Sequence, residues 1–166
     1  MKNKSPEIHD PNNPLSSGWK SAGGTSVTFK EIIDEYERGN SKTVHVGTDS
    51  HDSNKRYTFA NVICFIRNNS SKYFFRRHII PINRFKDINS RILEEANQSI
   101  LLASLFSLHV DEDVKLVIHS DSNTKSNFVT SRITPVIRNW TISMGFEFRS
   151  KPDAWASSSV ADRHSK

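Results

Sequence analysis

The chain has 166 residues, of which 35% are hydrophobic and 25% charged, and its formal net charge is +5. This length and composition fit one globular domain with a single core, and they exclude a disordered or fibrous chain. The modest basic excess is compatible with a polyanionic partner such as nucleic acid, and equally with a solubilising surface.

Cysteine usage and hydropathy bear on the compartment. The single cysteine, Cys64, excludes an intramolecular disulfide, and its apolar neighbours NVICFI indicate a core thiol in a reducing environment. No stretch approaches the roughly 18 apolar residues of a membrane span, and the N-terminal residues MKNKSPEIHDPNNP contain no apolar signal core. We therefore expect a cytoplasmic protein without a membrane partner.

The first part of the chain predicts an arm, a helix and three strands. Residues 1–25 are rich in Asn, Pro, Ser and Gly and predict an irregular N-terminal arm, whereas residues 26–166 are expected to form the folded domain. Apolar residues at helical spacing predict a helix over Ser26–Arg38 that ends at Gly39. Three strand-like runs joined by short polar turns then predict an antiparallel meander: Thr43–Asp49, Arg56–Arg67 and Lys72–Ile80.

The second part of the chain alternates between helical and strand patterns. Pro135 is expected to start or kink a helix. The expected elements are, in chain order, a long helix, a short strand, a mainly helical segment, a last strand and a terminal helix: Ile88–Leu108, Val114–His119, Thr124–Met144, Phe146–Ser150 and Ala154–Lys166. This order predicts an α/β fold in which helices pack on a mixed five-stranded sheet whose first three strands form the meander.

Acidic residues occupy the ends of predicted strands and the faces of predicted helices. Asp49 ends the first strand, and Asp121 follows the fourth strand in VIHSDSN. The long helix carries Glu94 and Glu95, and the terminal helix carries Asp162. Carboxylates that converge at one edge of a sheet bind hard cations such as Mg²⁺ or Mn²⁺, and two such ions roughly 3.5–4 Å apart support phosphodiester hydrolysis.

The order strand Asp, helix Glu, strand Asp, helix Asp resembles that of the ribonuclease H-like fold. More closely, roughly residues 19–166 resemble the YkuK-like family of predicted ribonuclease H-like proteins, through VGTDSH, the C-terminal segment KPDAWASSSVADRHSK and the SVTFKEII helix before the first strand. The resemblance implies a nuclease with two Mg²⁺ or Mn²⁺ ions that acts on RNA, an RNA/DNA hybrid or structured DNA. Its implied catalytic and metal-binding residues are Asp49, Glu95, Asp121 and Asp162.

Two of these assignments leave a neighbouring acid as an alternative. Successive helical residues point about 100° apart, and Glu95 lies at the edge of the apolar face, so it is favoured over Glu94. Nine residues of continuous helix span roughly 13 Å, so one ion cannot bind both Asp153 and Asp162. Asp153 follows a proline and suits a helix N-cap, which favours Asp162. Each acid also has a plain structural reading, as a turn residue or as a solvated helix charge.

Other polar residues are weaker candidates. The spacing of His45, His51, His119 and His164 matches no usual zinc pattern, although His51 or His164 could move a proton or contact phosphate. The stretch KYFFRRHIIPINRFK interleaves basic and aromatic side chains and leaves open phosphate contacts by Arg76, Arg77, Arg84 and Lys86. Residues beside the acids could orient them: Ser50, Ser122 and Asn123.

The acids and the basic excess support two functional hypotheses. The first is a divalent-metal-dependent nuclease, and the alternative is an inactive ribonuclease H-like module that binds nucleic acid or a protein partner. Fold alone does not separate the two. The geometry of the acids does, because carboxylates that stand too far apart to share a cation favour the binding module.

Overall fold

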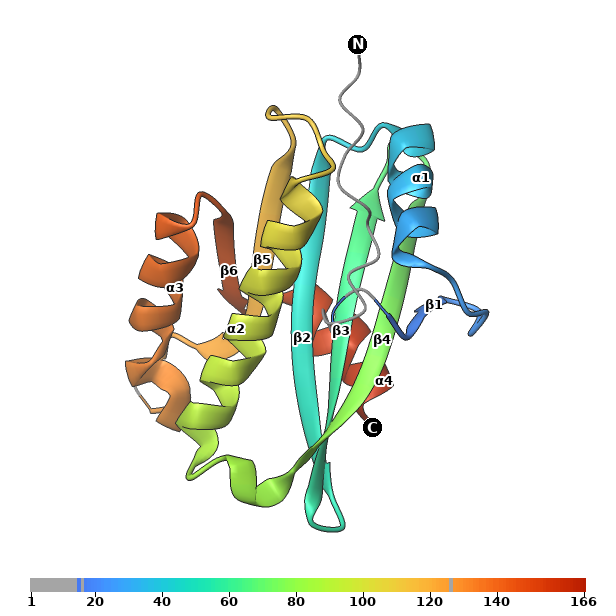
Figure 1. Ribbon diagram of the computed structural model, residues 1–166. Coiled ribbons are helices and arrows are strands. Elements are labelled where there is room, and N and C mark those ends of the chain that lie inside the picture. The colour runs from blue at the N-terminus through green and yellow to red at the C-terminus, as the bar shows by residue number, and fades with distance from the viewer. Residues whose placement is uncertain (1–14, 16, 126) are drawn as a thin grey trace.

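A six-stranded mixed sheet with helices on both faces forms the protein (Figure 1). The structure, a computed structural model, describes residue 15, residues 17–125 and residues 127–166. The strands lie in the order β1-β4-β3-β2-β5-β6. The predicted α/β class is therefore confirmed, and the predicted count of five strands is short by one.

The extra strand, β1 (Trp19–Ser21), lies within the stretch for which the sequence predicts an irregular arm. It pairs antiparallel with β4, where Trp19 stands opposite Arg76. Trp19 is almost fully buried, and its indole donates a hydrogen bond to the Leu15 carbonyl over 2.7 Å. Burial of this one large ring stabilises a three-residue strand that has too few residues to show a periodic pattern.

The predicted meander is present as β2 (Thr43–Ser53), β3 (Arg56–Ile66) and β4 (Ser71–Pro81). Strand β2 runs four residues beyond its predicted end at Asp49, and its pairing with β3 continues to Ser53 and Arg56. A two-residue turn closes this hairpin, with Asn54 and Lys55 both at positive φ, which matches the right-handed twist of the strands. The turn, rather than side-chain burial, stabilises the polar end of β2.

Two helices cover one face of the sheet (Figure 1). Helix α1 (Phe29–Gly39) starts at a capping box between Thr28 and Glu31, so the helix begins three residues later than predicted. Helix α2 (Ile88–Ser107) follows the short turn η2 (Ile82–Arg84) and is capped by Asp87. The main core lies between these helices and β2 to β4 and includes Phe29, Ile32, Val46, Phe65, Ile100 and Phe106.

The remaining strands extend the sheet beside β2. Strand β5 (Lys115–Asn123) pairs parallel with β2, and β6 (Glu147–Lys151) pairs parallel with β5. Between them lie a short turn, η3 (Val129–Arg132), and helix α3 (Thr134–Ser143). Helix α3 starts at Thr134 with Pro135 in its first turn, where a proline is tolerated, and so begins well after Thr124, the start of the predicted helical segment.

The C-terminal segment packs on the opposite face of the sheet, behind β2 and β3 in Figure 1. It is a π-helical turn, η4 (Ala156–Ala161), that continues into α4 (Asp162–Ser165). A second apolar cluster joins it to the sheet and includes the predicted core thiol of Cys64. Within the described part of the chain, no helix is both long and apolar enough to span a bilayer.

Candidate active site

Strands β2 and β5 pair over their first halves and then separate. Their parallel pairing runs from Thr43 and Lys115 to Gly47 and His119. Beyond that point β2 stays with β3, while β5 continues beside β6, where it shifts register before Asn123. The sheet is therefore split at this level. Parallel strands that diverge leave a space at the edge of the sheet that side chains from both faces can enter.

Asp49 and Asp121 stand on either side of this split. Each lies two residues beyond the last paired residue of its strand, Gly47 in β2 and His119 in β5. Because strand side chains alternate and paired residues share a face, both acids project on the same face of the sheet as Gly47 and His119. That face is the one covered by the C-terminal segment, since His119 accepts a hydrogen bond there from the Ala156 amide over 3.2 Å.

Asp49 is 8% exposed and is held by the C-terminal segment. The Ser165 hydroxyl donates a hydrogen bond to its Oδ2 over 2.7 Å. Burial raises the pKa of Asp49 to about 6, and the charges of Asp121 and Asp162 act in the same direction. The hydrogen bond from Ser165 and the charge of Arg91 oppose the rise. The Asp49 carboxyl is therefore buried near other acidic side chains, and this environment favours a bound cation.

Glu95 reaches the split from the α2 face. It is 4% exposed, and its Oε1 accepts a hydrogen bond from the Ser50 hydroxyl. Burial, followed by the charge of Asp49, raises the pKa of Glu95 to about 8. Its second carboxylate oxygen is buried and has no partner among the described residues. By contrast, Glu94 accepts hydrogen bonds from the side chains of Asn97 and Gln98, outside the split.

Asp121 and Asp162 are each neutralised by a lysine. Lys151 Nζ lies 2.9 Å from Asp121 Oδ2, and Lys166 Nζ lies 2.7 Å from Asp162 Oδ2. Burial raises the pKa of Asp121, the hydrogen bond and charge of Lys151 lower it, and the charge of Asp162 raises it. The other oxygen of Asp121 is buried without a partner among the described residues. The candidate acids thus influence one another electrostatically although they lie on four different elements, β2, α2, β5 and α4.

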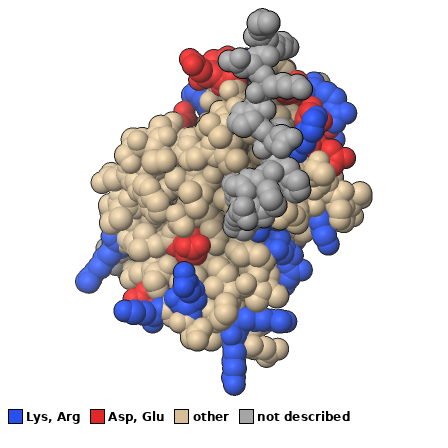
Figure 2. Space-filling model, viewed as in Figure 1, with Lys and Arg blue, Asp and Glu red and all other residues tan. Residues whose placement is uncertain are grey.

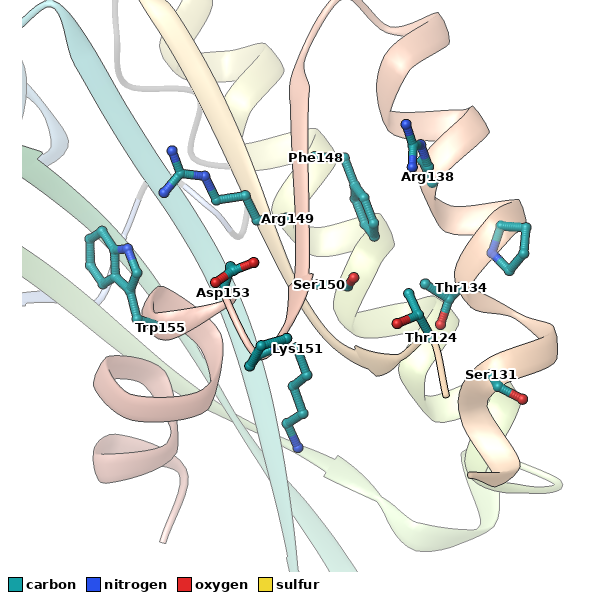
Figure 3. A pocket seen from close by; sticks show the side chains of 12 residues that line it. Thr124, Ser131, Thr134, Arg138, Phe148, Arg149, Ser150, Lys151, Asp153 and Trp155 are labelled. Carbon is teal, nitrogen blue, oxygen red and sulfur yellow. The ribbon is translucent and has the colours of Figure 1, made fainter. Parts of the chain in front are cut away.

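Asp153 lies apart from this cluster. It is exposed, and it lines a cavity with Arg149 and Trp155 on the far side of β6 from Phe148, as Figure 3 shows. Its charge is not among the influences on Asp49 or Asp121. The structure therefore places Asp162, and not Asp153, beside the first two acids.

The donor set suits a hard cation, but the acids do not form a ready-made cage. In the described part of the chain, no three His, Cys, Asp or Glu side chains are arranged so that they could hold a metal ion as they stand. By the geometric criterion drawn from the sequence, this arrangement favours the binding module. Lysine ammonium groups also compensate Asp121 and Asp162. The unpartnered oxygens of Glu95 and Asp121 are ligands of the type that Mg²⁺ and Mn²⁺ prefer.

A close approach of the C-terminal segment to the sheet positions Asp162 and Ser165. A Cβ atom on Gly47 would lie 2.7 Å from the Ser157 nitrogen and 2.8 Å from the Ala156 carbonyl carbon. Only glycine leaves room for that backbone here. Gly47, which precedes Thr48 and Asp49 in VHVGTDS, therefore allows the C-terminal segment that carries Asp162 to lie close to the sheet.

A buried histidine pair fixes the same contact. The Ala156 amide must donate, so His119 Nδ1 accepts and its Nε2 carries the proton. That proton is donated to His45 Nδ1 over 2.9 Å. Burial lowers the pKa of His119 to about 3 and that of His45 to about 4, so both rings are neutral near pH 7. The two histidines therefore join β2 and β5 to the C-terminal segment through hydrogen bonds.

The other residues considered from the sequence lie elsewhere. Among the basic candidates, Arg76 is buried and donates to Asn61 Oδ1, whereas Arg77, Arg84 and Lys86 are exposed. His51 is exposed, and His164 stacks on Phe75 with ring centroids 3.6 Å apart.

Of the residues expected to orient the acids, Ser50 contacts one of them. It bonds Glu95 and accepts from Arg91 over 3.0 Å. The Ser122 hydroxyl instead accepts from Ser120, and the Asn123 side chain accepts from the Lys125 amide.

Four residues of the site were not predicted: Gly47, Arg91, Lys151 and Ser165. Two of them carry a signal in the sequence. Arg91 lies one helical turn before Glu95, and Ser165 lies one turn after Asp162, so each shares a helix face with an acid. The roles of Gly47 and Lys151 depend on contacts between distant segments and carry no local signal.

The fold and the acids at its split sheet define the class: an α/β protein of the ribonuclease H-like fold. A family model described as Ribonuclease H-like matches residues 27–166. The chain belongs to this family, as its resemblance predicts, and the membership points to a nucleic-acid-related function. A search of curated proteins returned no match to the chain.

Proposed function

We propose that the protein is a divalent-metal-dependent nuclease that hydrolyses phosphodiester bonds in RNA, an RNA/DNA hybrid or structured DNA. The observation that carries the proposal is the burial of Asp49 and Glu95 at the split between β2 and β5, where the charge of Asp121 acts on both carboxylates. Two buried acids with the half-buried Asp121 and Asp162 nearby are costly in the absence of a cation. Membership of the Ribonuclease H-like family supports the same reading.

In this proposal the four carboxylates hold the cations. One or two Mg²⁺ or Mn²⁺ ions would supply Lewis acidity to polarise the scissile phosphate and to lower the pKa of the attacking water. Ser50 and Ser165 fix the orientation of Glu95 and Asp49 through their hydroxyl groups. Arg91 donates to the Ser50 carbonyl over 2.8 Å and offsets part of the negative charge.

Lys151 and Lys166 have a second role in the proposal. Each is a solvent-accessible cation that compensates an acid in the free protein. With a divalent cation bound, the two ammonium groups would be free to contact the phosphates of the substrate. Lysine suits this exchange, because its flexible stem lets one point charge serve two partners.

The test is a cleavage assay with Mg²⁺ or Mn²⁺ on labelled single-stranded, hybrid, duplex and branched oligonucleotides. Asp49→Asn is expected to abolish cleavage and to weaken Mn²⁺ binding in calorimetry. Two neighbouring substitutions serve as matched controls: Glu94→Gln against Glu95→Gln, and Asp153→Asn against Asp162→Asn. The proposal fails if no substrate is cleaved and Asp49→Asn binds Mn²⁺ as the parent does.

The two lysine ion pairs favour one alternative, a module that binds nucleic acid without turnover. A cluster that lysines neutralise permanently has no need of a cation. This alternative predicts nucleic-acid binding that is salt-sensitive, independent of divalent ions and unchanged in Asp49→Asn. Binding measured in EDTA and in Mn²⁺ separates it from the nuclease.

A further inference from the structure

Two adjoining cavities lie beside the candidate active site. One has a volume of about 820 Å³ and includes Lys151, and the other has a volume of about 710 Å³ and includes Lys42 and Arg67. Both are lined by Arg149 and Trp155, so they meet at these two residues. The larger cavity also extends past β6 to α3, where Arg138 and Phe148 line it (Figure 3). We refer to the joined space, which Lys151, Arg149 and Trp155 line, as the β6 trough.

The trough adjoins one of the candidate acids, Asp121, through Lys151. Arg149 stands in register with His119, and strand alternation puts Arg149 and Lys151 on the same face as Asp121. Lys151 then bridges the two places, since its ammonium group lies 2.9 Å from Asp121. A ligand that contacts Lys151 in the trough therefore lies next to Asp121.

The charge of the trough is positive. Three cations and one acid, Asp153, line the larger cavity, and no acid lines the smaller one. Among the described residues Arg149 forms no salt bridge, whereas Lys42 and Arg67 pair with Asp113 and Glu35. The face over α2 and α3 differs, because Figure 2 shows a broad area there without charged side chains. An uncompensated guanidinium in this trough selects for an anionic ligand.

The spacing and the aromatic ring define the ligand further. Arg149 and Lys151 stand two residues apart on β6, about 6.7 Å at the backbone, and Figure 3 shows their charged groups pointing in different directions along the trough. Trp155 is half-buried, and its ring packs on His45 and His119 with centroids 4.8 and 4.9 Å away. This packing holds the indole still, as a platform for base stacking requires. Cavities of this volume admit a few nucleotides rather than a duplex.

We propose that the β6 trough binds the single strand of nucleic acid that leads to the scissile phosphate, with Lys151 and Arg149 on backbone phosphates of that strand and Trp155 stacked on a base. The proposal rests on the nuclease function proposed above for the position of the scissile phosphate. It adds a substrate class: a nucleic acid that presents a single-stranded segment next to the cleaved bond.

The experiment measures binding of fluorescein-labelled 12-nucleotide oligo(dT) and oligo(U) to the Asp49→Asn protein in EDTA, across a range of salt concentrations. Adding Arg149→Ala is expected to weaken binding about tenfold, as loss of one charge-assisted contact does. The slope of log affinity against log salt should fall by about 0.7, the value for one phosphate of a single strand. Lys30→Ala, which removes an equally exposed charge from α1, is the matched control and should leave both quantities unchanged.

A second readout does not depend on charge. Oligonucleotide binding should quench the fluorescence of Trp155, and the quenching should disappear in Trp155→Phe, which keeps an aromatic ring against the histidines. Three outcomes overturn the proposal: Arg149→Ala binds like Lys30→Ala, a blunt 12-base-pair duplex binds as well as the single strands, or polyglutamate of equal charge displaces them equally well. The last outcome would indicate an acidic polypeptide as the partner.

The design separates this proposal from the nuclease. Binding by the Asp49→Asn protein needs no cleavage. If binding depends on Arg149 but the parent cleaves nothing, the nuclease proposal is wrong and the trough proposal stands. If the parent cleaves oligonucleotides and Arg149→Ala cleaves long and short ones equally well, the trough proposal is wrong and the nuclease proposal stands.

Discussion

Asp49 and Asp121 stand at the same height on two parallel strands that have just stopped pairing, each two residues past the Gly47–His119 pair. This relationship, more than either residue alone, makes the site. It opens the sheet where two acids of one face can meet Glu95 from the other face. The predictions below examine what holds that arrangement in place.

Gly47→Ala should displace the C-terminal segment. The new Cβ would meet backbone atoms of Ala156 and Ser157 at 2.8 and 2.7 Å, and backbone cannot rotate away as a side chain can. We expect a loss of about 1–3 kcal/mol in the free energy of unfolding, measured with urea, and a loss of Mn²⁺ binding. Gly23→Ala is the control, since its nearest neighbour lies 3.9 Å away. Equal stability of the two variants would contradict the prediction.

Lys166→Ala should strengthen metal binding. The Lys166 ammonium group occupies Asp162 in the free protein, so an incoming cation must displace it. Removal of this competitor is expected to raise the Mn²⁺ affinity severalfold in calorimetry, an exposed ion pair being worth roughly 0.2–1 kcal/mol. Arg163→Ala removes a neighbouring exposed charge and serves as the control. An unchanged or weaker affinity in Lys166→Ala would show that the lysine does not compete with the cation.

Glu95→Gln should change how stability depends on pH in metal-free protein. The folded-state pKa of Glu95 is raised to about 8 from 4.5, so the folded state holds a proton that the unfolded state releases. Stability from this group is therefore present at low pH and is lost as pH rises from about 4.5 through 8. Relative to the parent, Glu95→Gln should gain on the order of 3 kcal/mol between pH 5 and pH 8.5.

Urea unfolding of both proteins in EDTA at several pH values measures this difference. Glu94→Gln, which alters the neighbouring carboxylate, should give a profile parallel to that of the parent. Parallel profiles for Glu95→Gln would mean that Glu95 is ionised in the folded protein. Mn²⁺ at pH 8.5 should stabilise the parent more than Glu95→Gln, because a cation compensates the buried charge.

Ser165→Ala should raise the pKa of Asp49 above its value of about 6 in metal-free protein. The lost hydroxyl donated to the carboxylate, and a donor to the charged form lowers the pKa. Carbon-detected NMR titration of the Asp49 carboxyl measures the change. Mn²⁺ affinity should then fall more at pH 6.5 than at pH 8. Ser159→Ala, at an exposed position on the same segment, should alter neither quantity.

Much of the fold could be predicted because its signals are local. The apolar runs before Asp49 and Asp121 locate two strands, and the helical face around Ala96 distinguishes Glu95 from Glu94. Strand β1 could not be predicted, since one buried tryptophan stabilises it. The late start of α3 depends on where Pro135 fits, and not on helical periodicity across the polar residues before it.

The residues that complete the site were harder to predict, for a different reason. Lys151 reaches Asp121 across a register shift between β5 and β6, which no sequence spacing records. Gly47 is required by the Ala156 backbone, more than a hundred residues later in the chain. Such contacts are set by how segments pack, so they become visible only in three dimensions.

The dispersal of the four acids over β2, α2, β5 and the C-terminal segment has a kinetic consequence. Pairing of β2 with β5 closes a loop of about seventy residues, and contacts of this range form late and slowly. A cation that requires all four acids has nothing to bind in the early stages of folding. The cation should therefore leave the refolding rate unchanged and slow unfolding. It would stabilise the folded protein without speeding its formation.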